Sequence, residues 1–387
     1  PDSLGKTQVK ELIKTAKEPV KSVLEMRLQL SKSSVKKYTA MKQTACRDNR
    51  ARGMFSFYGA SRTGRWAGRN IQLQNLPQNH LEDLTEAREL VKTGSFDDVQ
   101  MIYDDVPDTL SQLIRTAFIP RQGMKFIVAD FSAIEARVIA WLADEQWVLD
   151  AFANNKDLYC ETASRMFGVP VEKHGINGEL RQKGKQCTLS CSYGGAKGAL
   201  IAMGAIDSGM KEDELQPLVI AWREANPNIV RFWHSLEQCA MKCIKEKTVT
   251  KTNRLTFSYE AGFLFIELPS GRRLAYAKPR IGENKFGGES ITYMGINAQK
   301  KWDRLETFGG KIAENVCQAV ARDLLMYSMQ TLSHCFIVAT VHDEIIIEAS
   351  KDMSLDVVCQ QMARTPKWAE GLILRADGYE CEYYKKD

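Results

Sequence analysis

The chain has 387 residues, of which 44% are hydrophobic and 26% charged, and its formal net charge is +5. This length exceeds what one small core needs and predicts two or three domains or subdomains. The composition is that of an ordinary globular protein, and no apolar run is long enough to cross a bilayer. We therefore expect no membrane span and no membrane partner.

Ten cysteines are scattered along the chain. The pairs Cys187/Cys191 and Cys239/Cys243 have the i, i+4 spacing of a helix rather than the CxxC spacing of a zinc ribbon. We predict reduced, mostly buried thiols and a reducing, cytosolic setting. The chain begins at Pro1 without a signal-type start, so we expect a piece of a longer protein.

Basic residues concentrate at the front of the chain. Residues 1–70 carry 16 Lys or Arg and 5 Asp or Glu, whereas the remainder carries 37 and 43. Residues 8–46 have helical spacing interrupted at Pro19, and residues 61–78 are expected to be loop and short strand. The excess of positive charge fits a polyanion such as nucleic acid or a solvated helix face, and charge alone does not choose between them.

A short apolar run at residues 125–130 (KFIVAD) predicts a buried strand, and the following SAIEARVIAWLADEQWVLDAF predicts a helix. Asp130 would then lie at the exit of the strand. Ser132 and Glu135 have the spacing of a capping box, which is the favoured interpretation of Glu135 from the local sequence alone.

The next helix is expected over residues 179–199, closed by two glycines near its end. Arg181, Lys185, Leu189 and Tyr193 recur at every fourth position and would form one stripe along it. Such a stripe can grip a triphosphate with its two cations and place an aromatic ring under a sugar and base. Taken alone, it fits a solvent-facing amphipathic helix better.

Three further elements complete the chain. Residues 268–281 are typical of a hairpin, residues 309–332 of a long amphipathic helix, and residues 336–349 (FIVATVHDEIIIEA) of two apolar strands joined by a turn that displays Asp343. Together with Asp130 this turn gives two strand-end carboxylates. Such a pair can hold two hard divalent cations about 3.5–4 Å apart for displacement at phosphorus. Sequence separation leaves open whether the two carboxylates meet.

Five ordered motifs resemble those of the DNA polymerase I family, also called family A. Its three polymerase motifs are similar in order and spacing to DFSAIEAR at 130–137, RQKGKQCTLSCSYGG at 181–195 and VHDE at 341–344. In addition, TGRWAGRNIQLQNLP at 63–77 resembles the TGR…LQNIP segment of the family, and QAVARD at 318–323 is similar to its QGTAAD helix. The resemblance covers most of the chain.

The resemblance implies an α+β fold of the right-hand polymerase type, with a palm built on a small antiparallel sheet, helical fingers and a partial helical thumb. The expected divisions are the thumb at 1–60, a first palm part with the first polymerase motif at 61–137, the fingers at 138–297 and a second palm part at 298–387. The second motif would lie on a fingers helix at 179–195 and the third on a palm hairpin at 336–349.

The resemblance also implies template-directed DNA synthesis, in which a dNTP is added to a primer 3′-hydroxyl and pyrophosphate is released with the help of two Mg²⁺ ions, or of Mn²⁺ in their place. The catalytic residues would be Asp130, Asp343, Glu344 and Lys185, with Asp130 and Asp343 holding the metal ions. The dNTP would be bound by Arg181, Lys185, Leu189, Tyr193, Glu135 and Tyr159. Primer–template DNA would be bound by Arg65, Gln74, Asn75, Gln318 and His342.

The expected partners are primer–template DNA and dNTPs, together with a separate exonuclease domain or a processivity factor. No acidic cluster of a 3′–5′ exonuclease is visible, so proofreading within this chain is not expected. His342 also fits an ordinary polar residue of a hairpin.

At three positions the chain departs from the family pattern. Leu189 stands where the family usually has Phe or Tyr, as in some viral members, so we expect a phage-like variant with altered discrimination against 3′-deoxy terminators. Tyr159 stands where a histidine is frequent, which would weaken a phosphate contact. Ala133 stands where glutamine is common, and we transfer no role to it.

Two alternatives remain open. A single-subunit RNA polymerase shares the strand-end aspartates, but it needs room for a 2′-hydroxyl where Glu135, resembling the steric gate of the family, would stand. A catalytically inactive remnant that binds primer–template would be expected to have lost Asp130 or Asp343, and both are present. The sequence therefore favours a DNA polymerase over both.

Overall fold

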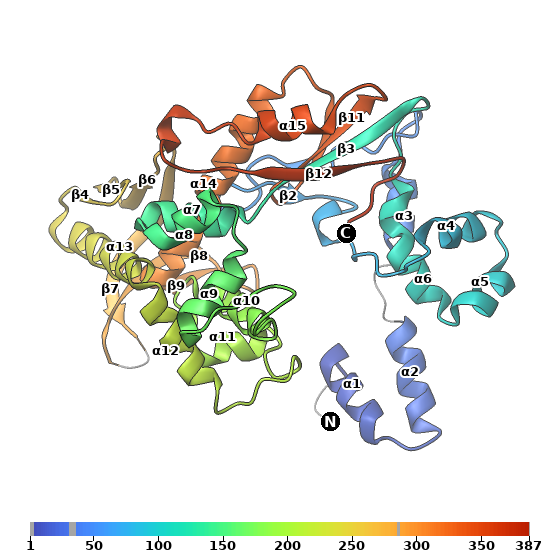
Figure 1. Ribbon diagram of the computed structural model, residues 1–387, viewed down its shortest axis with the longest axis horizontal. Helices are drawn as coiled ribbons and strands as arrows, with labels where there is room; N and C mark the ends of the chain where they lie inside the picture. The colour runs from blue at the N-terminus through green and yellow to red at the C-terminus, as the bar shows by residue number, and fades with distance from the viewer. Residues whose placement is uncertain (1–3, 31–35, 285–286, 387) are drawn as a thin grey trace.

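The computed structural model describes residues 4–30, 36–284 and 287–386, and the parts of our predictions that fall on residues 1–3, 31–35, 285–286 and 387 lie outside them. Helices surround a four-stranded and a six-stranded antiparallel sheet (Figure 1), in agreement with the predicted α+β class. None of the described helices is long and apolar enough to cross a membrane.

Short helices make up the N-terminal part. Pro19 separates the first two, as predicted, and Figure 1 shows them at one end of the molecule beyond α3–α6. The Tyr38 hydroxyl on α3 donates a hydrogen bond to the Leu110 carbonyl of α6 at 2.8 Å. The helices α4–α6 were not predicted. The bounds are α1 Lys6–Thr15, α2 Val20–Leu30, α3 Lys36–Thr44, α4 Leu84–Lys92, α5 Phe96–Tyr103 and α6 Val106–Leu113.

The segment between α3 and α4 is irregular, as predicted for residues 61–78. Two short strands pair in it, and a single 3-10 turn follows them. These elements are β1 Phe55–Ser56, β2 Ala67–Gly68 and η1 Leu73–Asn75, and a further turn, η2 Ile114–Ala117, follows α6.

The four-stranded sheet has the order β10–β11–β3–β12, and all of its pairings are antiparallel. Its central strand β3 is buried on both faces, which explains the uninterrupted apolar run of its sequence. Ile127 and Ala129 pack into the large core with residues of α7 and α14, whereas Phe126 and Val128 pack against the segment around η1. The strands are β3 Met124–Phe131, β10 Ile337–Val341, β11 Glu344–Ser350 and β12 Ala376–Cys381.

Three helices cover this sheet and connect it to the rest of the chain. The long helix predicted at 309–332 is present as α14 Gly309–Thr331, and much of it is buried. The other two are α7 Ile134–Ala143 and α15 Leu355–Met362, and η3 Lys367–Ala369 precedes the last strand.

A second group of helices follows α7 in the sequence. Trp222 and Trp233 stack within it with ring centroids 6.2 Å apart, and both belong to the large core. Of the ten cysteines, all free thiols, Cys187 and Cys191 on α10 are fully buried. The helices are α8 Gln146–Ala153, α9 Leu158–Phe167, α10 Leu180–Cys191, α11 Lys197–Ala202, α12 Leu215–Ala225 and α13 Pro227–Glu246.

The six-stranded sheet differs from our expectation of helical fingers over residues 138–297. Helices end at Glu246, and the following strands pair in chain order as a meander. We had predicted only a hairpin at 268–281, where the structure has the β6–β7 turn and the first part of β7. Positive φ angles at Asn253 and Gly262 close two of the tight turns. The strands are β4 Thr250–Thr252, β5 Leu255–Glu260, β6 Phe263–Glu267, β7 Arg273–Glu283, β8 Glu289–Ile296 and β9 Trp302–Thr307.

Candidate active site

The pairing of β11 with β3 brings the two strand-end aspartates to the same edge of the four-stranded sheet. Asp130 lies opposite Glu344 in the register, and Asp343 immediately precedes Glu344 in the turn. The backbone N–H of Phe131 donates to the Asp343 carbonyl at 3.5 Å. The meeting of the two carboxylates, which sequence separation left open, is therefore a property of the sheet.

Both aspartates are half-buried carboxylates, and neither forms an ion pair within the described part of the chain. Burial, followed by the charges of Asp343 and Glu344, raises the pKa of Asp130 to about 7. Burial also raises the pKa of Asp343. The Oδ1 atom of Asp130 is buried and has no hydrogen-bond partner among the described residues. Lys386 and Arg65 lie near enough to lower the pKa of Asp343, but their charges do not offset its burial. The pair thus lacks the direct ion-pair partner that a buried carboxylate ordinarily has.

Glu344 does not share this situation, and here our prediction of a turn displaying its carboxylates needs correction. Glu344 is the first residue of β11 and only 2% exposed. Its carboxylate accepts hydrogen bonds from the Tyr384 hydroxyl at 2.8 Å and from Lys386 Nζ at 3.4 Å. Sequence reasoning missed both partners, because nothing in the C-terminal YYKK links it to a strand 40 residues earlier.

Glu135 is held by tertiary contacts, and the capping-box interpretation is wrong. The helix α7 begins after Ala133, whose left-handed φ of 51° displaces Ser132 from the N-cap position. Instead, the Glu135 carboxylate accepts a hydrogen bond from the Tyr193 hydroxyl at 2.9 Å and lies 3.3 Å from Arg65 Nη1. Burial raises the pKa of Tyr193 well above its usual value, so the phenol remains a hydrogen-bond donor.

The predicted helix at 179–199 is present as α10 but ends earlier. It stops at Cys191, and Gly194 follows with a φ of +80°, so Tyr193 lies beyond the helix rather than on the predicted stripe. Nevertheless, residues of α10 and of the segment after it line one cavity of about 220 Å³ together with Asp343. Its lining includes Glu135, Tyr159, Leu189, Tyr193 and Asp343.

Arg181 and Lys185, two of the three cations on α10, lie outside the lining of that cavity. Arg181 donates from Nε and Nη2 to one carboxylate oxygen of Asp157, at 3.0 and 2.8 Å, and this pairing raises its pKa. Its guanidinium also lies 5.3 Å from the centre of the Tyr159 ring. Lys185 is half-buried one turn further along the helix. The pairing of Arg181 with Asp157 was not predicted from the sequence. Asp157 is also the N-cap of α9, and this is the only role that its local sequence signals.

The second cavity, of about 180 Å³, lies beside the first. It is lined by Lys156, Asp157 and Arg375 and shares Ala133 and Tyr159 with the first cavity.

The residues assigned to DNA gather on elements next to the aspartates. Arg65 lies on the loop between β1 and β2 and faces Glu135, and Gln74 donates to the Thr340 carbonyl of β10 at 3.4 Å. His342 is exposed in the turn with a left-handed φ of 59°. Asn75 is exposed at the end of η1, and Gln318 is half-buried on α14.

The fold is that of a polymerase domain. A solved structure described as the "POL domain of Pol1 from M. smegmatis complex with DNA primer-template and dNTP" aligns with 98% of this chain and 56% of its own chain, with a TM-score of 0.65. The two sequences are 18% identical, so this likeness concerns the fold alone.

The sequence comparisons give the family. Residues 3–369 match DNA polymerase family A, and the chain belongs to this family. The DNA polymerase of Bacillus phage SP02 is 51% identical over 391 residues, which cover 100% of this chain and 60% of that protein. The thermostable DNA polymerase I of Thermus aquaticus is 27% identical over 251 residues, which cover 63% of this chain and 25% of that protein. The chain thus spans less than two thirds of these curated relatives.

Proposed function

We propose that this chain carries out template-directed DNA synthesis, adding dNTPs to a primer 3′-hydroxyl and releasing pyrophosphate. The observation that carries this proposal is the half-buried pair Asp130/Asp343, which has no ion-pair partner among the described residues, beside a cavity that Asp343 itself lines. Membership of DNA polymerase family A and the polymerase fold support it. The domain divisions expected from the sequence, and a reducing cytoplasmic setting, remain part of this proposal.

Mg²⁺ fits the donors at the sheet edge. Among the described residues no group of three or more His, Cys, Asp or Glu side chains is arranged to hold a metal ion, so the protein contributes a pair of carboxylates. Mg²⁺ commonly binds through one or two carboxylates, with water and substrate phosphates completing its coordination. Asp130 and Asp343 would hold two such ions, or Mn²⁺, and bound ions would supply charge stabilisation and activate the primer hydroxyl.

The contacts of Glu135 support a deoxynucleotide substrate. Its carboxylate is fixed on the cavity wall by Tyr193 and Arg65, so it cannot swing away freely to admit a bulkier sugar. We assign it the exclusion of the 2′-hydroxyl. Leu189 is 48% exposed on the same wall and would contact the nucleotide without an aromatic face.

The cations of α10 would bind the triphosphate. Arg181 would donate hydrogen bonds to the phosphate oxygens, either in place of its bonds to Asp157 or in addition to them. Lys185 would neutralise charge that develops on the leaving pyrophosphate. Tyr159, in contact with Arg181 and on the cavity wall, would complete this side.

Primer–template DNA would lie across the elements next to the aspartates. Arg65 and Gln318 would contact the minor-groove side of the primer terminus, where the acceptor pattern is nearly independent of sequence. Gln74, Asn75 and His342 would contact the strands near the same edge. The basic residues at the front of the chain would bind phosphates, so the affinity should fall steeply with salt. Glu344 would act only through its neighbours.

Primer extension tests this function. Wild type is offered dNTPs or rNTPs with Mg²⁺ on a primed template, beside Asp343→Asn, Glu135→Ala and the exposed control Asp352→Asn. We expect extension with dNTPs only, abolished by Asp343→Asn, relaxed toward rNTPs by Glu135→Ala and unchanged in the control. Binding of primer–template without extension in Mg²⁺ or Mn²⁺ would contradict the proposal, and equal use of rNTPs by wild type would favour an RNA polymerase.

A further inference from the structure

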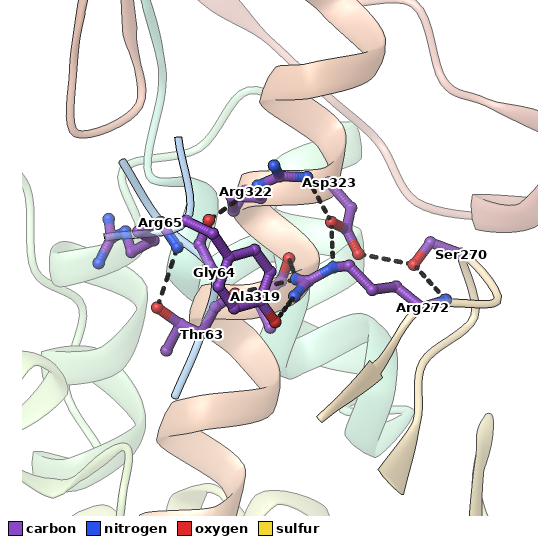
Figure 2. Close-up of polar contacts among 9 residues, drawn as sticks. Thr63, Gly64, Arg65, Ser270, Arg272, Ala319, Arg322 and Asp323 are labelled. Carbon is purple, nitrogen blue, oxygen red and sulfur yellow. Dashed lines mark hydrogen bonds and ion pairs between the residues drawn. The ribbon is translucent and has the colours of Figure 1, made fainter. Parts of the chain in front are cut away.

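A buried ionic cluster grips the loop that carries Arg65. Figure 2 shows Arg272, from the end of the β6–β7 connection, and Arg322, from α14, on the same stretch of the β1–β2 loop. Arg272 Nη2 donates to the Thr63 carbonyl at 2.9 Å, and Arg322 Nε donates to the Gly64 carbonyl at 3.0 Å. Two guanidinium groups from distant parts of the chain therefore hold two successive carbonyls immediately before Arg65.

Asp323 joins the two guanidinium groups. Its Oδ1 accepts from Arg272 Nε at 2.7 Å and lies 3.4 Å from Arg322 Nη1, and its Oδ2 accepts from the Ser270 hydroxyl at 2.6 Å. Asp323 and Arg322 are each only 7% exposed. We call Ser270, Arg272, Arg322 and Asp323 the loop clamp.

The loop itself is shaped to accept the clamp. Gly64 has a φ of +75°, and an added Cβ there would lie 2.5 Å from the Tyr58 ring and 2.7 Å from Arg272 Nη1, so glycine alone fits. The guanidinium of Arg322 lies 4.8 and 4.7 Å from the ring centres of Phe57 and Trp66. The loop is thus held by aromatic contacts as well as through its carbonyls.

Two residues assigned to DNA lie next to the clamp. Arg65 follows Gly64 directly, and its side chain reaches Glu135 from the position that the clamp sets. Gln318 precedes Arg322 by four residues on α14, so the two lie on one face of the helix. Stability alone explains this cluster poorly, because apolar side chains of the same volume avoid the desolvation of buried ions.

We propose that Arg272, Arg322 and Asp323 are positioning residues that set Arg65 and Gln318 against the primer–template terminus. The inference rests on the proposed DNA-polymerase function and adds to it a group that does not itself touch the substrate. Loss of the clamp leaves the aspartate pair intact but lets the loop move, so it weakens productive binding of the primer terminus.

The test compares Asp323→Asn with Glu348→Gln as a matched control. Glu348 is also a buried carboxylate held by two arginines, Arg50 and Arg121, but it lies at the far end of β11 from the aspartates. We expect Asp323→Asn to raise the KM for primer–template about tenfold, a size typical of coupling through a contact network, and Glu348→Gln to change it less than about twofold.

Two further variants keep the test sharp if Asp323→Asn fails to fold. Arg322→Lys keeps a cation beside Asp323 but loses the planar Nε–H that holds the Gly64 carbonyl. Arg65→Ala, alone and combined with each clamp variant, asks whether the clamp acts through Arg65. Because the clamp also positions Gln318, we expect each double variant to lose more than Arg65→Ala alone but less than the product of the two single losses. Fully multiplied effects would overturn the proposal.

Hydrogen exchange of the loop gives a readout without catalysis. The amides of Ala60 and Gly64 are hydrogen-bonded within the loop, to the carbonyls of Arg65 and Ala60 at 3.0 and 2.8 Å. We expect faster exchange there in Asp323→Asn and Arg322→Lys but not in Glu348→Gln. Unchanged exchange, or an unchanged KM in both clamp variants, would overturn the inference while extension by wild type leaves the proposed function standing. Absence of extension by wild type would overturn both.

Discussion

The paired strands β3 and β11 carry buried or half-buried carboxylates toward both ends. The two ends differ in whether these carboxylates have ion-pair partners. At one end Glu348 is 2% exposed and accepts hydrogen bonds from Arg50 Nη2 at 2.8 Å and from the Arg121 backbone N–H at 2.6 Å. At the other end, neither Asp130 nor Asp343 forms an ion pair within the described part of the chain.

This difference separates a stabilising site from a reactive one. A buried carboxylate with two guanidinium partners has its charge compensated inside the protein. Two neighbouring carboxylates without a direct ion-pair partner repel each other, and a bound ligand of positive charge would relieve this repulsion. Local instability of this kind is common at functional sites, where activity takes precedence over stability. The comparison predicts that substitutions at the two ends separate activity from stability.

The largest expected effect is on catalysis at the aspartate end. Asp343→Asn should lower the rate of primer extension about a thousandfold, because metal-ion stabilisation of the transition state is worth several kcal/mol. The same change removes part of the repulsion with Asp130, so the melting temperature without metal should not fall. Extension assays and thermal unfolding of one preparation check both, and a large fall in melting temperature would break the contrast.

The next effect is on stability at the other end. Glu348→Gln leaves two arginines with a weaker partner and should lower the free energy of unfolding by about 2 kcal/mol, less than for a fully buried pair because Arg121 reaches solvent. Extension per folded molecule should stay within about twofold. Urea unfolding and an active-site titration measure the two quantities. Loss of activity without loss of stability would contradict the assignment of Glu348.

The gain in stability on binding of Mg²⁺ should also differ between variants at the two ends. At a free Mg²⁺ concentration about ten times its Kd, wild type should gain about 1.4 kcal/mol of stability. Glu348→Gln should gain as much, whereas Asp343→Asn should gain clearly less. Thermal unfolding over a Mg²⁺ series, with Ca²⁺-free buffer and an ionic-strength control of NaCl, checks this. Equal gains in all three proteins would place the metal elsewhere.

The smallest expected effect is a pH dependence of stability that belongs to Glu348. Burial raises its pKa, but hydrogen bonds from Arg121 and Arg50 outweigh burial, and the folded-state pKa lies below the ordinary value of 4.5. Its contribution is therefore present above the unfolded-state pKa and lost as pH falls through the folded-state pKa, each unit of depression being worth about 1.4 kcal/mol.

The stability gap between wild type and Glu348→Gln should accordingly be full near neutral pH and shrink below about pH 4.5. Urea midpoints of both proteins across this range measure the gap. A gap that stays constant with pH would show that Glu348 is held by packing rather than by its charge.

Sequence alone predicted those parts of the molecule whose signals are local. The apolar run before Asp130, the strand–turn–strand pattern around Asp343 and the period of α14 each lie within one element. Both faces of β3 and most of α14 are buried. The distribution of apolar residues along each element therefore predicts its secondary structure correctly.

Features that depend on contacts between distant segments could not be predicted in this way. The burial of Glu344 depends on Tyr384 and Lys386, and the orientation of Glu135 depends on the left-handed backbone of Ala133 and on Tyr193. No local pattern signals such contacts. The six-stranded sheet was missed for another reason, because the alternating pattern of a strand is a weaker signal than the period of a helix of the same length.

The most direct test of the central claim is single-turnover incorporation of one dNTP on a preformed complex of the protein with primer–template. Wild type and Asp130→Asn are compared, with DNA affinity measured in the same samples. If the aspartate pair holds the catalytic metal ions, the DNA affinity is unchanged in the variant and the incorporation rate is lowered about a thousandfold. A rate within about threefold of wild type would contradict it, because the pair would then serve no step of the reaction.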